Sequence, residues 1–106
     1  VFTKDLKENG RFNDVLLMTF SEFGRRVSQN ASGGTDHGTA NNMFLIGGGI
    51  KEKGLINPMP DLSDLDGGDL KYKVDFKNVY ATILKNWLGA DDMAILKKKY
   101  DYLKFV

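Results

Sequence analysis

The chain contains no cysteine, so its side chains can form neither a disulfide framework nor a thiolate metal site. Any metal ion that they hold must be bound through oxygen and nitrogen atoms. Histidine is nearly absent as well, because His37 is the only one in 106 residues. His37 is therefore the only residue that could supply an imidazole ligand to a metal. Without cysteines, the sequence does not indicate the redox state of the compartment.

An excess of charge of either sign is also missing. The chain carries 15 basic and 14 acidic residues, which gives a formal net charge of +1 at pH 7. Neutralising the phosphates of a nucleic acid requires a surplus of lysine and arginine on one surface. Only residues 97–99 form a run of lysines, so we expect no nucleic-acid partner.

Long apolar runs are absent too. The longest, residues 15–18 and 43–46, fall far short of the roughly 20 residues that cross a bilayer. No charged-then-apolar leader opens the chain, and the pair Arg25 and Arg26 is followed by polar residues rather than by the apolar segment of an export signal. The sequence therefore predicts neither a membrane span nor a targeting segment.

The composition that remains is that of one small globular domain over residues 1–106, with 42% hydrophobic and 27% charged residues. The opening residues have the pattern of the tail of a helix that ends at Asn9 and Gly10. We therefore expect a helix there, in a chain that begins inside a larger parent protein.

Apolar patterning predicts an α/β fold. Residues 14–20 form a nearly continuous apolar segment, typical of a strand buried on both faces of a parallel sheet, and residues 42–46 form a second run. Helical spacing of apolar residues begins after Asp75, a fitting N-cap, and stops at Gly89. Two shorter elements are also predicted, an edge strand over residues 70–74 and a helix over residues 91–99.

Between the two apolar runs lies a polar segment, residues 21–38, which is rich in glycine, serine and asparagine. We interpret it as an ordered loop with one helical turn near residues 22–27. Long ordered loops in compact domains commonly carry binding or catalytic groups. The candidate functional residues are therefore expected in this segment.

Asp36 and His37 are the sharpest candidates in the polar segment. On a loop, adjacent side chains can converge on one ion, and Gly38 lets the backbone come close. In the alternative interpretation, Asp36 forms an Asx turn and His37 hydrogen-bonds a carbonyl. Spacing alone leaves the two interpretations evenly matched.

Glu22 follows the first apolar run, where a carboxylate at the end of a parallel strand would meet a ligand. The residues alone favour helix capping instead, with Ser21 as the N-cap and Glu22 in the first turn. Arg25 and Arg26 could each hold an oxyanion through paired hydrogen bonds or pair with surface acids. For Arg26 we expect the surface pair.

Three blocks of sequence, FSEFGRR, GGTDHGTANNMFLIGGGIK and DLKYKVDFKNVYATILKNWLG, resemble the carboxyl-terminal part of the DUF1501 family. The resemblance covers about residues 12–103. It implies kinship with the alkaline phosphatase and sulfatase superfamily, and hence a partial alkaline-phosphatase-like α/β sandwich, a few-stranded sheet with flanking helices. It also implies a divalent metal (Zn, Mn, Mg or Ca), which relatives use to hydrolyse phosphate or sulfate esters.

Two alignments to the superfamily's metal ligands compete. In the first, Asp36, His37 and Gly38 match the Asp-His-Gly ligand motif. In the second, residues 21–24 take that place and His37 matches a later single histidine. We prefer the second because a strand precedes each ligand segment. It puts Phe23 where the superfamily has a histidine, which weakens or removes one ligand.

The resemblance thus makes Glu22, Asp36 and His37 predicted metal ligands and Arg25 a predicted catalytic contact to an oxyanion. The superfamily's nucleophile and first acidic ligands come from earlier strands, so we expect this chain alone to be inactive. Its expected partners are the amino-terminal part of the parent, a small anionic ligand, and a second copy through self-association. The rival hypothesis is a non-catalytic binding or structural domain, and an exported, extracytoplasmic parent fits the family.

Overall fold

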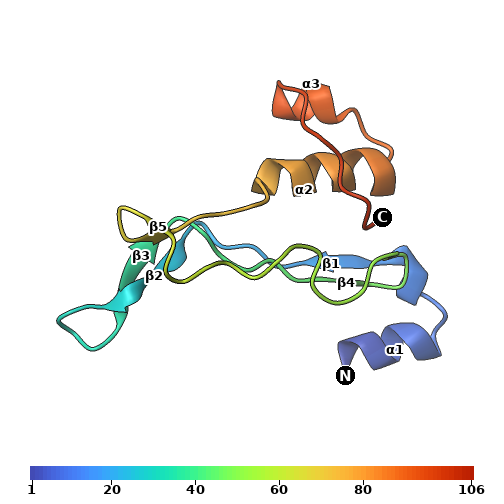
Figure 1. Cartoon of the computed structure of the whole chain (residues 1–106). Helices are drawn as coiled ribbons and strands as arrows, with labels where there is room; N and C mark the ends of the chain where they lie inside the picture. The colour runs from blue at the N-terminus through green and yellow to red at the C-terminus, as the bar shows by residue number, and fades with distance from the viewer. The chain divides into compact units, whose positions relative to one another are not determined.

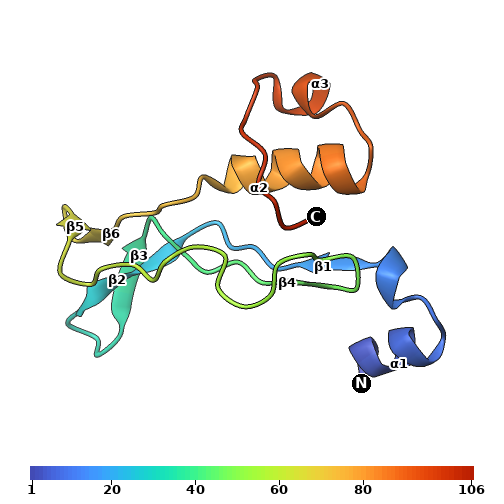
Figure 2. The ribbon, with the colours of Figure 1, turned by 45° about the vertical axis from the view of Figure 1, so that its right-hand side comes forward.

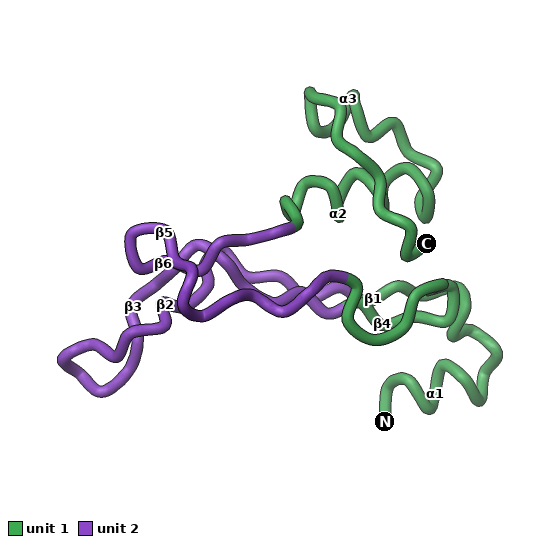
Figure 3. Tube along the Cα trace, in the orientation of Figure 1, with its two compact units in different colours: residues 1–17, 45–56, 74–106 green, residues 18–44, 57–73 purple.

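The computed structural model describes all residues from Val1 to Val106. Short helices lie near both ends of the sequence, with short strands between them (Figure 1, Figure 2). The chain divides into two compact units, unit 1 with residues 1–17, 45–56 and 74–106, and unit 2 with residues 18–44 and 57–73 (Figure 3). The elements are, in order, α1 (Phe2–Glu8), the 3₁₀ turn η1 (Phe12–Asp14), β1 (Leu16–Met18), β2 (Gly24–Gln29), β3 (Thr35–Gly38), β4 (Leu45–Gly47), β5 (Leu65–Asp66), β6 (Asp69–Leu70), α2 (Phe76–Thr82), the π-helical turn η2 (Ile83–Trp87) and α3 (Asp92–Leu96).

Each sheet of the structure contains two strands, β1 with β4, β2 with β3, and β5 with β6. The chain is therefore a mixed α and β protein, as the apolar patterning predicted, and its sheets are small and antiparallel. None of its helices combines the length and the apolar character that crossing a bilayer requires.

The first apolar run forms only the short strand β1, and both of its faces stay partly exposed. β1 runs antiparallel to β4. The amide of Gly48 donates to the carbonyl of Phe12, and the preceding residue, Gly47, lies against the later residue Leu16, so the two segments run in opposite directions. The prediction of a strand buried on both faces of a parallel sheet over residues 14–20 is therefore wrong. An apolar run reports how hydrophobic the two faces are, and not how many strands adjoin or in which direction they run.

Two of the helices predicted in unit 1, at the start of the chain and after Asp75, are confirmed. α1 is capped by Asn9, and Gly10 takes the left-handed conformation (φ 66°) that commonly follows a helix. α2 begins after Asp75, whose carboxylate accepts a hydrogen bond from the amide of Lys77 at 2.9 Å. It continues as η2, after which Gly89 is left-handed (φ 63°). Local capping signals were sufficient to locate these helices.

The helix predicted over residues 91–99 is confirmed only over α3, because Lys97 takes a left-handed conformation (φ 59°) and ends it. The chain then crosses α2 on its way to the C-terminus (Figure 2). Phe105 in this segment is fully buried, and its carbonyl accepts a hydrogen bond from the amide of Lys51 at 2.8 Å. The C-terminal residues thereby complete a small hydrophobic core, whose buried members are Val79, Ala81, Phe105 and Val106.

Thr82 ties the C-terminal segment to α2. Its side chain is fully buried, and its hydroxyl donates to the carbonyl of Asn78 at 2.6 Å and accepts from the amide of Leu103 at 2.8 Å. Valine in place of Thr82 leaves the Leu103 amide without an acceptor, so the free energy of unfolding should fall by about 2 kcal/mol in urea denaturation. Thr82→Ser, which keeps the hydroxyl, is the control. An equal loss in both variants would show that the hydrogen bond contributes nothing.

β2 and β3 form an antiparallel hairpin in unit 2 (Figure 1). The interpretation of residues 21–38 as a loop with a helical turn near residues 22–27 is therefore wrong. Gly24 and Gly38 lie opposite each other, and the backbone around them is tightly packed. A Cβ atom on Gly24 would lie 1.5 Å from the carbonyl oxygen of Ala40. Glycine at this position allows the strand and the segment after β3 to approach.

Asn30 organises the turn of this hairpin. Its side-chain oxygen accepts hydrogen bonds from the amides of Ser32 at 3.1 Å and Gly34 at 3.0 Å. Its side-chain amide donates to the carboxylate of Asp36 at 3.0 Å. The residues that predicted a long loop are therefore those that build a turn between two strands.

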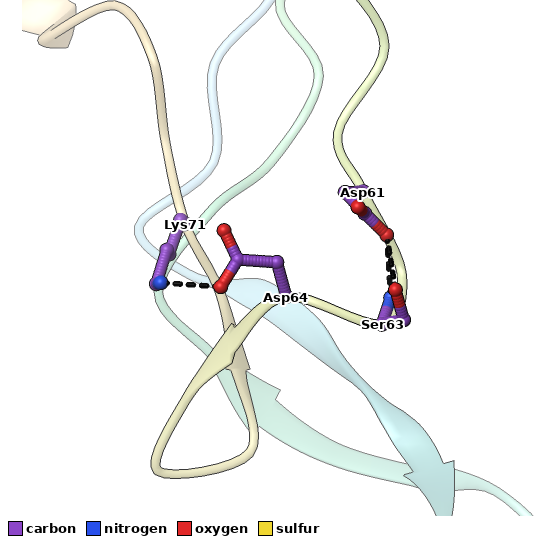
Figure 4. Close-up of polar contacts among 4 residues, drawn as sticks. All are labelled: Asp61, Ser63, Asp64 and Lys71. Atoms are coloured by element: carbon purple, nitrogen blue, oxygen red, sulfur yellow. Dashed lines mark hydrogen bonds and ion pairs between the residues drawn. The ribbon is translucent and has the colours of Figure 1, made fainter.

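The second hairpin of unit 2 joins β5 and β6, and exposed polar contacts surround it (Figure 4). The carboxylate of Asp61 accepts hydrogen bonds from the hydroxyl and the amide of Ser63, which lower the pKa of Asp61. The ammonium of Lys71 donates to Asp64, which raises the pKa of Lys71. The edge strand predicted over residues 70–74 overlaps the observed strand β6 only at Leu70, where β6 ends.

Candidate functional site

The β2–β3 hairpin places a predicted metal ligand beside a predicted oxyanion contact. Arg25 in β2 lies directly opposite His37 in β3. Directly opposite side chains lie on the same face of an antiparallel pair, so the guanidinium and the imidazole share one face. Arg25 is further held by a hydrogen bond from Nη1 to the carbonyl of Thr35 at 2.8 Å.

Phe23 lies on the same face of the hairpin. Its ring stacks on the imidazole of His37, with the ring centroids 3.7 Å apart and the planes at 14°. The guanidinium carbon of Arg25 lies 5.5 Å from the centroid of the same phenyl ring. We call Phe23, Arg25 and His37 the hairpin cluster. Because Arg25 and His37 are exposed, a ligand can reach both polar groups.

Asp36 is not part of the hairpin cluster. It precedes His37 within β3, and successive side chains of a strand point to opposite faces. Its carboxylate instead accepts the hydrogen bond from Asn30 in the turn. The expected convergence of Asp36 and His37 on one ion depended on a loop conformation, and the strand removes that basis.

Glu22 lies exposed just before β2. Helix capping by Ser21, the alternative that the residues favoured, does not occur, because the Ser21 hydroxyl donates to the carbonyl of Phe23 and a strand follows. No group of three or more His, Asp or Glu side chains in the structure is arranged to hold a metal ion. Glu22, Asp36 and His37 are therefore not brought together, and their roles as ligands stay predictions.

Arg26 confirms the expectation of a pair with an acidic residue. Its Nε lies 3.1 Å from Oδ1 of Asp69 in β6, and its Nη2 lies 3.5 Å from Oδ2 of the same carboxylate. The pair is partly buried, since the Asp69 side chain is only 24% exposed. Arg26 thus joins the two hairpins of unit 2. Of the two adjacent arginines, Arg25 is the one that faces solvent.

The two motifs that competed as metal-ligand matches lie side by side in this hairpin. Residues 21–24 end at Gly24 and residues 36–38 end at Gly38, and these two glycines are directly opposite each other. The stack between Phe23 and His37 then connects one motif to the other. Sequence reasoning missed this stack, because only the register of the strands shows which side chains face each other.

The hairpin cluster offers two kinds of polar chemistry on one apolar support. A neutral imidazole binds Zn²⁺ and other transition metals through a ring nitrogen. A guanidinium is permanently charged and donates paired hydrogen bonds to phosphate, sulfate or carboxylate oxygens. The exposed face therefore suits an anion, either alone or beside a metal ion.

Comparison with known proteins places the chain in a protein family. Residues 1–102 match the model of DUF1501, described as a protein of unknown function. The matched stretch contains the hairpin cluster and every helix and strand of the structure. No curated protein and no solved structure matches the chain.

Proposed function

The chain belongs to the DUF1501 family, and from this premise we propose that it is the carboxyl-terminal segment of a metal-dependent hydrolase-like protein that acts on phosphate or sulfate esters. The resemblance to the alkaline phosphatase and sulfatase superfamily, with its α/β sandwich, supplies the reaction class. The observation that carries the proposal is the placement of Arg25 directly opposite His37 on an exposed face. An imidazole and a guanidinium side by side are the groups that a metal and an oxyanion require.

In this proposal, His37 is a metal ligand and Arg25 binds the ester's non-bridging oxygens. A divalent metal held there would supply Lewis acidity and would activate a water molecule as nucleophile near neutral pH. Arg25 would stabilise the negative charge that develops on the transferring group, because its side chain donates paired hydrogen bonds and is held on the same face as His37. Glu22 and Asp36 stay the predicted oxygen ligands, which suits a site without thiolates, and because Asp36 lies on the opposite face of β3 from His37, β3 would have to change its conformation for both to bind one ion.

Completion of the site requires residues from another polypeptide segment. A catalytic metal site usually has three protein ligands and one open position. The chain groups no such set, so we propose that the amino-terminal part of the parent provides the others. Partly exposed apolar strand residues support a docked partner, since Leu17 of β1 is 37% exposed and Ile46 of β4 is 43% exposed. We therefore expect no ester hydrolysis by this chain alone.

Zinc titration tests the role of His37 directly, because the chain labelled with ¹⁵N-histidine gives imidazole signals from this residue alone. After removal of metal by a chelator, saturable Zn²⁺ binding should shift these signals. His37→Ala should abolish the binding measured by calorimetry. Glu22→Ala and Asp36→Asn should each weaken the affinity by about tenfold, the effect of losing a ligand or a group that orients one.

The matched control for this titration is Glu52→Ala, which removes an exposed carboxylate outside the hairpin and should bind Zn²⁺ like the wild-type chain. Binding that survives His37→Ala would refute the metal role of the hairpin. Binding lost in His37→Ala but unchanged in Glu22→Ala and Asp36→Asn would remove the two carboxylates from the proposed ligand set and leave His37 in it.

Non-catalytic binding of a small anion is the second candidate function. It is favoured by the exposed guanidinium of Arg25 in a structure that groups no set of metal ligands. Calorimetry with inorganic phosphate or sulfate separates the two candidates. Anion binding that persists in excess chelator and is lost in Arg25→Gln would favour this function over the hydrolase.

A further inference from the structure

We propose that Phe23 is a positioning residue, which fixes the orientation of the His37 imidazole and of the Arg25 guanidinium. The proposal rests on the proposed function, because it assigns Phe23 a role toward the two groups that would meet the metal and the anion. In the preferred alignment to the superfamily's metal ligands, Phe23 occupies the position of a histidine ligand. The structure gives this phenyl ring a role of its own.

The phenyl ring contacts both polar groups of the hairpin cluster. It covers one face of the His37 imidazole almost in parallel, at a centroid distance of 3.7 Å. The Arg25 guanidinium lies over the same ring at 5.5 Å, within the range of a cation–π interaction. Rotation of either polar side chain away from this face would give up its contact with the ring.

The backbone of Phe23 is itself held in place. Its carbonyl accepts hydrogen bonds from the hydroxyl of Ser21 at 2.8 Å and from the side-chain amide of Asn41 at 3.2 Å. The next residue, Gly24, is buried against the carbonyl of Ala40, too closely for any side chain. The hydrogen bonds to the Phe23 carbonyl and the close packing of Gly24 therefore restrict the backbone that carries the Phe23 ring, on which the imidazole stacks.

Arg25 is restrained at a second point, since its Nη1 donates to the carbonyl of Thr35 in the facing strand. The imidazole and the guanidinium thus have restricted orientations before any ligand arrives. Groups held in this way lose less conformational entropy on binding than freely rotating side chains do. Removal of the phenyl ring should therefore weaken binding even though Phe23 itself offers no ligand atom.

The experiment compares Phe23→Leu and Phe23→Tyr with the wild-type chain, by NMR of the His37 ring protons and by Zn²⁺ calorimetry. Phe23→Leu should move the ring protons away from their stacked positions, because the ring current is lost, and should weaken Zn²⁺ binding by about tenfold. Phe23→Tyr, which keeps an aromatic ring, should preserve both readouts. Phe20→Leu is the matched control, since Phe20 is 73% exposed and outside the hairpin cluster.

Unchanged ring-proton positions in Phe23→Leu would overturn the proposed stack. Moved ring protons with unchanged Zn²⁺ affinity would overturn the positioning role. A wild-type chain that binds no Zn²⁺ would refute a metal site held by the residues of this chain alone, and the ring-proton positions in Phe23→Leu would still decide whether Phe23 orients His37. Failure of the proposed function and failure of this inference are thereby distinguishable.

Discussion

Alanine in place of Gly24 should disrupt the β2–β3 hairpin and lower the free energy of unfolding by about 3 kcal/mol. The added Cβ atom would lie 1.5 Å from the carbonyl oxygen of Ala40 and 2.4 Å from the carbonyl carbon. Both are backbone atoms, so the clash cannot be relieved by rotating a side chain. The strand must move away, which also separates Arg25 from His37.

Gly34→Ala is the matched control in the same hairpin. A Cβ atom on Gly34 would meet nothing closer than the Asn30 side-chain oxygen at 3.9 Å, and this glycine does not require a left-handed backbone. Its stability should change by no more than about 1 kcal/mol, in either direction. Urea denaturation measures both variants, and amide hydrogen exchange in residues 24–38 reports the hairpin itself. Similar stabilities for the two variants would show that the contact at Gly24 relaxes freely.

The helices were predictable from the sequence because their signals are local. Asp75 caps α2 and Gly89 follows its end, so residues within one turn of each terminus were sufficient to locate it. Two other predicted helices likewise end at residues with left-handed or turn conformations. Predictions of this kind do not depend on what packs against the helix.

The β2–β3 hairpin was not predictable by the same means. β2 reads GRRVSQ, and only its first residue is buried, so no alternation of apolar and polar residues marks the strand. The prediction for β1 was wrong in the opposite direction, because it expected more pairing than the structure has. The apolar run suggested neighbouring strands on both sides, and the structure has one neighbour, β4. Strand pairing depends on residues far apart in the sequence, which composition and spacing do not report.

The candidate site shows the same division between local and long-range information. His37 and Arg25 were identified from their chemistry, and the structure places them opposite each other. The expected convergence of Asp36 and His37 assumed a loop, and the structure has a strand there, which sends adjacent side chains to opposite faces. Phe23 was predicted to weaken the site, and its contact with His37 became apparent only from the register.

Replacing Phe105 by alanine should destabilise unit 1 by about 4 kcal/mol, near the middle of the range for a large aromatic side chain removed from a core. Phe105 is fully buried, and only three other hydrophobic residues of the chain are buried with it, Val79, Ala81 and Val106. So small a core has few neighbours that can move to fill the cavity. The loss is comparable with the whole stability of a marginal domain, about 5 kcal/mol.

The measurement is thermal and urea denaturation, with amide hydrogen exchange in α2 to report the part of unit 1 against which the C-terminal segment packs. Phe105→Leu should lose clearly less, because it keeps most of the apolar volume. Phe20→Ala is the control for an exposed phenylalanine and should change the stability by at most about 0.5 kcal/mol. Equal losses in Phe105→Ala and Phe20→Ala would contradict the burial of Phe105. Because Phe105 lies beyond residues 1–102, which match the family model, the expected result would show that unit 1 depends for its stability on residues outside the matched stretch.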